Sequence, residues 1–350
     1  MQAGARALIR AAKEAVPRNS SNFLAALFST CTSTARALPC SGSIGRNSSS
    51  SVVFATKNAP ESFQARLLVP TPVRATARFS SLPKACFSTS TTTTTSTSTE
   101  SAASAAGADE NPQALRVAVI LSGSGFMDGS EITEAISTLI HLTANGCVVS
   151  CFAPNADFPA VNHLTGQPYL KADGKTPETR NALEEAARIA RGKVEPLEKF
   201  DPASFDALFL PGGFGAAKNL STFATDGPDM KVNPTVESVI RAFHEARKPI
   251  GAVCIAPVIL GKVLKSKATV TLGGEEEAGG EWPFAGATQA VQAMGAKHVP
   301  TTLEDVCIDR SARLVTGAAY MCGTAVPHQV FDNVGKVVDG LIALAQEEVR

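Results

Sequence analysis

The chain has 350 residues, of which 44% are hydrophobic, and its formal net charge is zero. This total conceals two regions, because residues 1–100 carry 11 Lys and Arg against 3 Asp and Glu, whereas the remainder carries 21 against 29. The acidic second region has no basic stripe, so nucleic-acid binding is excluded as the expected function. No apolar run approaches the length of a membrane span, so no membrane partner is expected either.

Residues 1–114 are predicted to be a disordered transit peptide and linker. The segment is rich in Arg, Ser, Thr and Ala, and Ser/Thr residues run without interruption from 88 to 99. Scattered arginines with few acids are typical of an organelle transit peptide. A disordered tail without a targeting role is the alternative. We predict import into the mitochondrial matrix, in preference to the plastid, and removal of the leader.

The predicted folded domain, 115–350, begins with a strand at 116–121 and a glycine-rich loop at 122–129. A helix follows and stops at Asn145-Gly146. It carries an apolar stripe at helical spacing, made of Ile132, Ile136, Leu139 and Ile140. A second strand is expected at 147–152. Thr176-Pro177 has the pattern that begins a helix, which we extend to Gly192.

Further strands are expected at 205–210, 250–253 and 268–272, with a helix at 236–246 before the second of them. Repeated strand-then-helix order predicts a single α/β domain with a parallel sheet covered on both faces. Chemistry in such sheets collects beyond the carboxyl ends of the strands. The loop around Gly125, the pair Gly212-Gly213 and Cys254 all occur at such ends.

Cys254 is the candidate nucleophile. It lies between the short apolar run 250–253 and Pro257, which suits a first helical turn. A cysteine at a strand-to-helix corner faces the positive end of the helix dipole, so we expect its thiol pKa to be lowered. The alternative is a buried structural cysteine.

The other motifs do not indicate a cofactor or a metal. Gly123, Gly125 and Gly129 give a spacing one residue off the dinucleotide fingerprint, and the second strand lacks the acid that would hold a ribose. The eight cysteines form no C-x-x-C pair and have no metal-ligand spacing. We therefore expect reduced thiols, no cofactor and no metal site.

Several sequence words carry a family resemblance. Leu210-Pro211-Gly212-Gly213, the Cys254 corner and an acid in the first strand–helix loop resemble the DJ-1/PfpI, class I glutamine amidotransferase-like superfamily. A closer resemblance, over residues 115–350, is to the ES1 family. Its words are Leu121-Ser122-Gly123-Ser124-Gly125, Asp128-Gly129-Ser130-Glu131-Ile132, Phe152-Ala153-Pro154, the run from Pro211 to Ser221, Cys254-Ile255-Ala256-Pro257 and Gly279-Gly280-Glu281-Trp282-Pro283.

The resemblance implies a flavodoxin-like three-layer α/β sandwich with a mostly parallel sheet, and a homodimer or larger assembly. It implies Cys254 as nucleophile, Glu131 as the acid beside the thiol, and the backbone N–H groups of Gly213 and Ile255 as the oxyanion pocket. The residues leave another role open for Glu131, because Asp128-Gly129-Ser130-Glu131 has the spacing of a helix capping box.

Three further residues are candidates for the pocket: Gly125, Asn219 and His163. Gly125 and Asn219 belong to the shared words, and His163 stands in a loop. A surface position is the alternative for His163.

The chain also departs from the superfamily pattern. Ile255 stands where many members have histidine directly after the cysteine, and no H-x-E occurs in the last hundred residues. These departures argue against a glutaminase and leave a Cys/Glu pair. We predict a cofactor-independent glyoxalase-like enzyme that converts small 2-oxoaldehydes to 2-hydroxy acids. The alternative is a non-catalytic, redox-responsive or chaperone-like protein in which Cys254 is oxidised.

Overall fold

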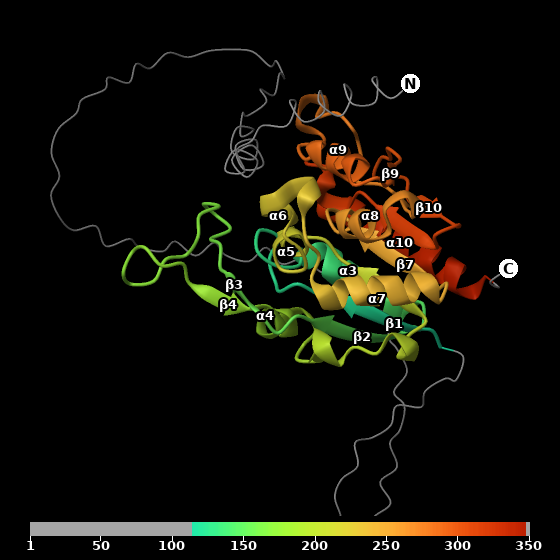
Figure 1. Ribbon diagram of the computed structural model, residues 1–350, viewed down its shortest axis with the longest axis horizontal. Coiled ribbons are helices and arrows are strands. Elements are labelled where there is room, and N and C mark those ends of the chain that lie inside the picture. Colours follow the sequence, from blue (N-terminus) through green and yellow to red (C-terminus); the bar gives the residue numbers. More distant parts are fainter. Residues whose placement is uncertain (1–113, 348–350) are drawn as a thin grey trace, which may run out of the picture. The chain divides into compact units, whose positions relative to one another are not determined.

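A central sheet of seven strands organises the protein (Figure 1), in a computed structural model that describes residues 114–347. The strand order is β10-β11-β7-β6-β1-β2-β5. The strands are β1 (Arg116–Ile120), β2 (Val148–Ala153), β5 (Val194–Pro196), β6 (Ala207–Leu210), β7 (Ile250–Val253), β10 (Cys307–Asp309) and β11 (Leu314–Gly317). Every neighbouring pair is parallel except β10 with β11. The predicted mostly parallel α/β sheet is therefore confirmed.

Helices cover both faces of this sheet (Figure 1). Crossovers from the centre run in opposite directions, from β1 to β2 and from β6 to β7. Right-handed crossovers then place their helices on opposite faces. α3 (Ile132–Ala144) packs with α10 (Pro327–Gln346) on one face, and α7 (Pro234–Glu245) packs with α8 (Pro257–Leu264) on the other. The strands β6 and β7 are consequently buried along their whole length.

Shorter elements complete the domain. β3 and β4 form an antiparallel arm, drawn in green at the left of Figure 1, and β8 pairs with β9. Their bounds are β3 (Asp157–Pro159), β4 (Thr179–Asn181), β8 (Thr269–Val270) and β9 (Lys297–His298). The remaining α-helices are α4 (Ala182–Ile189), α5 (Phe214–Lys218), α6 (Phe223–Asp226) and α9 (Gly286–Ala293). The 3₁₀ turns are η2 (Leu197–Lys199), η3 (Pro202–Ser204), η4 (Gly227–Asp229), η5 (Lys265–Lys267), η6 (Ala278–Gly280) and η7 (Ala319–Met321).

Two predicted elements are wrong in detail. The helix expected to begin at Thr176-Pro177 begins at Ala182, because the Asn181 side chain accepts hydrogen bonds from the N–H groups of Leu183 and Glu184 and caps it there. The strand expected at 268–272 shortens to β8, which lies in a separate two-stranded sheet beside β9. Local sequence preference identified both segments, but it did not predict the capping residue of the helix or the strand with which β8 pairs.

Three of the four residues in the apolar stripe predicted on α3 lie at the surface, and Leu139 is partly buried against the core. Ile132, Ile136 and Ile140 are 52%, 36% and 46% exposed. The buried face carries Leu142 together with the small or polar residues Glu134, Ala135, Ser137 and Thr138. Helical periodicity shows that a face is apolar without showing what covers it. The exposure of these isoleucines does not test the predicted homodimer, which stays a prediction.

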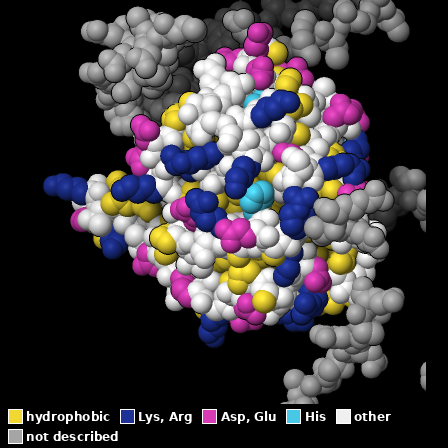
Figure 2. All heavy atoms as spheres, turned by 45° about the vertical axis from the view of Figure 1, so that its right-hand side comes forward, with side chains coloured by type: hydrophobic (Ala, Val, Ile, Leu, Met, Phe, Trp, Pro, Cys, Tyr) yellow, Lys and Arg dark blue, Asp and Glu magenta, His cyan; other side chains and the backbone are white. Residues whose placement is uncertain are grey.

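The surface shown in Figure 2 mixes basic and acidic side chains, and hydrophobic side chains lie between them. Among the described residues, no helix is both long and apolar enough to span a bilayer. The predicted leader lies outside the described residues.

Candidate active site

Cys254 occupies a sharp corner between β7 and α8, as the sequence predicted. Its φ angle is +60°, in the left-handed region that residues with a side chain rarely adopt. Its N–H donates to the carbonyl of Gly317 at 3.0 Å, which holds the strained backbone against β11. Strain of this kind costs on the order of 1–3 kcal/mol and persists where the surrounding structure imposes it. The strained corner therefore orients the sulfur, and the strain lowers the stability of the folded protein.

This strain gives a direct test of the corner. Cys254→Gly and Cys254→Ala both remove the sulfur, but only glycine relieves the positive φ angle. We expect the glycine variant to unfold with a free energy about 1 kcal/mol higher than the alanine variant, measured by urea denaturation. Equal stability of the two variants would show that the corner is unstrained.

Two backbone N–H groups face the sulfur. The register pairs Leu210 of β6 with Ala252 of β7, so the chain just after β6 runs beside Cys254. The N–H groups of Gly213 and Ile255 both donate hydrogen bonds to Cys254. Gly213 adopts φ = +97°, which suits glycine, and it precedes α5. The structure thus brings together Cys254, Gly213 and Ile255, in the arrangement that an oxyanion pocket needs.

Glu134 is the carboxyl that lies against the thiol. It stands in the first turn of α3, is 0% exposed and forms a hydrogen bond with the Cys254 side chain. Its Oε2 accepts from the Gly212 N–H at 2.9 Å, and its Oε1 accepts from the Tyr320 N–H at 3.2 Å. Gly212 leaves room for this contact, because a Cβ there would lie 2.9 Å from the Cys254 Sγ and closer still to Glu134 Oε2.

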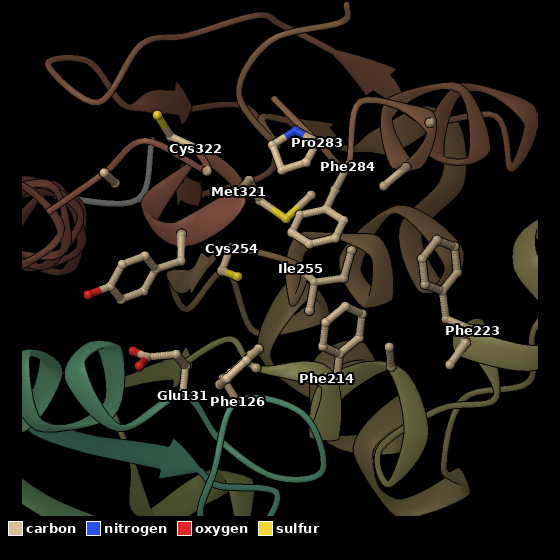
Figure 3. A pocket seen from close by; sticks show the side chains of 18 of the residues that line it. Phe126, Glu131, Phe214, Phe223, Cys254, Ile255, Pro283, Phe284, Met321 and Cys322 are labelled. Atoms are coloured by element: carbon tan, nitrogen blue, oxygen red, sulfur yellow. The ribbon is translucent and has the colours of Figure 1, made fainter. Parts of the chain in front are cut away.

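The expectation that Glu131 is the acid beside the thiol is therefore wrong. Glu131 is the N-cap of α3, and its Oε2 accepts from the Glu134 N–H at 2.7 Å. The predicted capping box is wrong as well, since Asp128 accepts instead from the Val161 N–H at 2.7 Å. Glu131 nevertheless lines the pocket that contains Cys254 (Figure 3).

Burial raises the pKa values of all three ionisable groups at the corner. It raises the pKa of Glu134 to about 8, with a further contribution from the negative charge of Glu131. Burial is also the largest cause of the raised Glu131 pKa, against the helix N–H groups that the carboxylate accepts from. For Cys254, burial and then the Glu134 charge raise the thiol pKa well above its ordinary value.

The predicted lowering of the Cys254 pKa is consequently wrong. The N–H groups of Gly213 and Ile255 do lower it, but desolvation outweighs them. Burial also raises the thiol pKa values of Cys147, Cys151 and Cys307. All five described cysteines are free thiols, as predicted.

A pocket of about 470 Å³ opens above the sulfur (Figure 3). Its lining is Phe126, Glu131, Gly213, Phe214, Ala217, Phe223, Ala224, Cys254, Ile255, Glu277, Pro283, Phe284, Gly286, Ala287, Tyr320, Met321, Cys322, Gly323 and Ala325. Phe214 and Phe284 meet edge to face, with ring centroids 5.8 Å apart. This volume and apolar character are those of a small-molecule site.

The three other predicted pocket residues support the first loop instead of lining the pocket. His163 Nε2 accepts from the Met127 N–H at 3.2 Å, and its ring lies where a Cβ on Gly125 would otherwise fall. The Asn219 side chain donates to the carbonyls of Ser122 and Asp128, at 2.8 Å each. Gly125 is needed at φ = +128° to let the histidine approach.

The chain is similar to several known proteins. The DJ-1/PfpI family model matches residues 117–273. Glutamine amidotransferase-like class 1 domain-containing protein 3, mitochondrial, from Homo sapiens is 48% identical over 232 residues, covering 66% of this chain and 84% of that protein. ES1 protein homolog, mitochondrial, from Rattus norvegicus is 47% identical, covering 65% and 84%.

A solved structure extends the likeness to the whole described domain. An isoprenoid biosynthesis protein with an amidotransferase-like domain from Ehrlichia chaffeensis has a TM-score of 0.57 and 34% identity, covering 66% of this chain and 99% of that one. The mitochondrial names of the relatives confirm the predicted organelle, while the matrix location and leader cleavage stay predictions. The chain belongs to the DJ-1/PfpI family and, within it, to the ES1 family.

Proposed function

We propose that this protein is a cofactor-independent, glyoxalase-like enzyme that converts 2-oxoaldehydes to 2-hydroxy acids. The observation that carries the proposal is the corner itself. Cys254 faces two N–H donors and a buried carboxyl with a pKa of about 8, and it borders a pocket. A nucleophile, a proton acceptor and oxyanion donors are the parts that addition to a carbonyl requires.

The proposed reaction begins with addition of the Cys254 sulfur to the aldehyde carbon. The carbon–sulfur bond forms, the thiol proton passes to the ionised Glu134 carboxylate, and the former carbonyl oxygen is held by the N–H groups of Gly213 and Ile255. The hydrogen on that carbon then moves as a proton to the neighbouring ketone carbon. The ketone oxygen takes up the proton that Glu134 received and becomes a hydroxyl, and the oxyanion becomes the carbonyl of a thioester. Water cleaves the thioester, releases the 2-hydroxy acid and restores the thiol, so no oxidant is needed.

Glu131 is our proposed shuttle for the proton between the two carbons. Its carboxylate lines the pocket, whereas the buried Glu134 lies behind the sulfur. Its raised pKa makes it easier to protonate than an ordinary carboxyl, which suits a group that takes up and returns a proton. Within residues 114–347, no histidine lines the pocket, so the Cys-His-Glu set of a glutaminase is not assembled there.

The proposal is tested by steady-state turnover of methylglyoxal without glutathione. We expect the full-length chain to form lactate in many-fold molar excess over protein, and prior alkylation of Cys254 with iodoacetamide to stop it. Yields that stop at one equivalent of adduct per protein would favour the non-catalytic alternative.

A further inference from the structure

The pocket beside Cys254 has a side that is lined by aromatic rings. Figure 3 shows Glu131 on one side of Cys254 and, on the other, Ile255, Phe214 and Phe284, with Phe223 farthest away. The aldehyde group of a substrate must lie at the sulfur. Whatever is attached to it then extends along the phenylalanines.

The charge of the lining restricts the substrate as well. Within the described part of the chain, the pocket lining includes the acids Glu131 and Glu277 but no Lys, Arg or His. An anionic group on the substrate would lose hydration without gaining a cationic partner among the lining residues. The lining therefore disfavours phosphorylated and carboxylated substrates.

The size of the pocket also exceeds what a small 2-oxoaldehyde fills. A volume of about 470 Å³ falls in the range of sites for drug-sized ligands. Methylglyoxal would leave the wall formed by Phe214, Phe223 and Phe284 without contact. An alkyl chain of several carbons would remove that apolar surface from water, and each buried methylene favours binding about four-fold.

We propose that the substrates are uncharged 2-oxoaldehydes that carry a medium-length alkyl or aryl group, seated along Phe214, Phe284 and Phe223. This inference rests on the proposed function for its reactive group. It replaces the expected small substrate by a larger, apolar one. Phe284 is the specificity-determining residue most open to test, because it is partly buried at the pocket rather than deep in the core.

The test compares methylglyoxal with 2-oxooctanal, and 2-oxooctanal with a 2-oxoaldehyde of equal length that ends in a carboxylate. We expect kcat/KM to rise at least about thirty-fold with the longer chain, since it adds five methylenes. The terminal carboxylate should lower it at least about ten-fold. A flat or falling chain-length series, with methylglyoxal turned over, would overturn the inference and leave the proposed function standing.

Two variants locate the effect. Phe284→Ala should lower kcat/KM for 2-oxooctanal about ten-fold more than for methylglyoxal. Phe331→Ala is the matched control, because this partly buried ring packs against His141, outside the pocket, and it should leave the ratio unchanged. An unchanged ratio in Phe284→Ala, with its melting temperature retained, would contradict the proposed seat of the chain.

A binding readout separates the two proposals. The same aldehydes are used to protect Cys254 of the full-length protein from iodoacetamide, which requires adduct formation but no turnover. Half-protection should occur at lower concentrations for 2-oxooctanal than for methylglyoxal, by at least about thirty-fold. If no aldehyde is turned over but this dependence is found, the glyoxalase proposal fails and the apolar specificity stands. If protection does not depend on chain length, the specificity fails.

Discussion

Cys254→Ala is expected to lower kcat/KM for 2-oxoaldehydes by on the order of a thousand-fold or more, because it removes the atom that bonds to the substrate. Gly213 and Ile255 would still present their N–H groups, so residual binding of the aldehyde is compatible with the loss. The measurement is steady-state lactate formation from methylglyoxal by the full-length protein, with the melting temperature recorded for each variant.

Cys322→Ala is the matched control for this result. Cys322 lines the same pocket and is 3% exposed, but its sulfur lies 3.4 Å from the Thr324 Oγ1 and points away from Cys254 (Figure 3). We expect turnover to change by no more than a few-fold. Equal losses in the two variants would show that the pocket tolerates no change of shape, and retained activity in Cys254→Ala would refute the nucleophile.

The architecture could be predicted because its buried strands are short apolar runs. The segments at 117–121 and 250–253 are buried at every residue, so their apolar composition alone identified them. The exposed face of α3 could not be predicted in the same way. Ile132, Ile136 and Ile140 repeat at the spacing of a core face, and only the packing of α10 beside α3 decides which side is buried.

The sequence predicted the nucleophile and the two backbone N–H groups of the site, but it did not predict which carboxyl lies beside the thiol. Cys254 and the N–H groups of Gly213 and Ile255 follow from strand ends that a parallel register must bring together. Glu134 was missed because the sequence segment shared with the ES1 family, Asp128 to Ile132, ends before it. The available signal was its helical phase, since it shares the buried face with Ala135 and Thr138, and a carboxyl on a buried face indicates a functional group.

Glu134→Gln is expected to remove the pH dependence that the wild-type corner shows near pH 8. In the wild type, Glu134 must ionise before it can accept the thiol proton, so alkylation of Cys254 by iodoacetamide should accelerate as pH rises through about 8. Glutamine cannot take up that proton. We expect turnover to fall about a hundred-fold or more, and the alkylation profile to lose its rise near pH 8.

Glu131→Gln is the matched comparison, one helical turn away. Its amide oxygen can still accept from the Glu134 N–H, so the cap of α3 should survive. The negative charge of Glu131 raises the Glu134 pKa, and removing it should therefore move the alkylation profile to lower pH without abolishing it. Turnover should still fall if Glu131 is the shuttle. Identical alkylation profiles for both variants would contradict the assignment of Glu134 as the partner of the thiol.

Glu134→Gln should also flatten the dependence of the unfolding free energy on pH. The Glu134 pKa is about 8 in the folded protein against an ordinary value of 4.5, so the folded state binds this proton more tightly than the unfolded state. The resulting stabilisation is complete below pH 4.5 and is lost as pH rises toward and through 8, by on the order of a few kcal/mol. Glu134→Gln lacks this loss, although its single carbonyl oxygen leaves either the Gly212 or the Tyr320 N–H unpaired, at a cost of about 1–3 kcal/mol. Urea unfolding between pH 5 and 9 should show the variant less stable than the wild type at the acid end and level with it, or more stable, at the alkaline end. Parallel curves would mean that folding does not raise the Glu134 pKa, and would contradict its assignment as a carboxyl that is protonated at neutral pH.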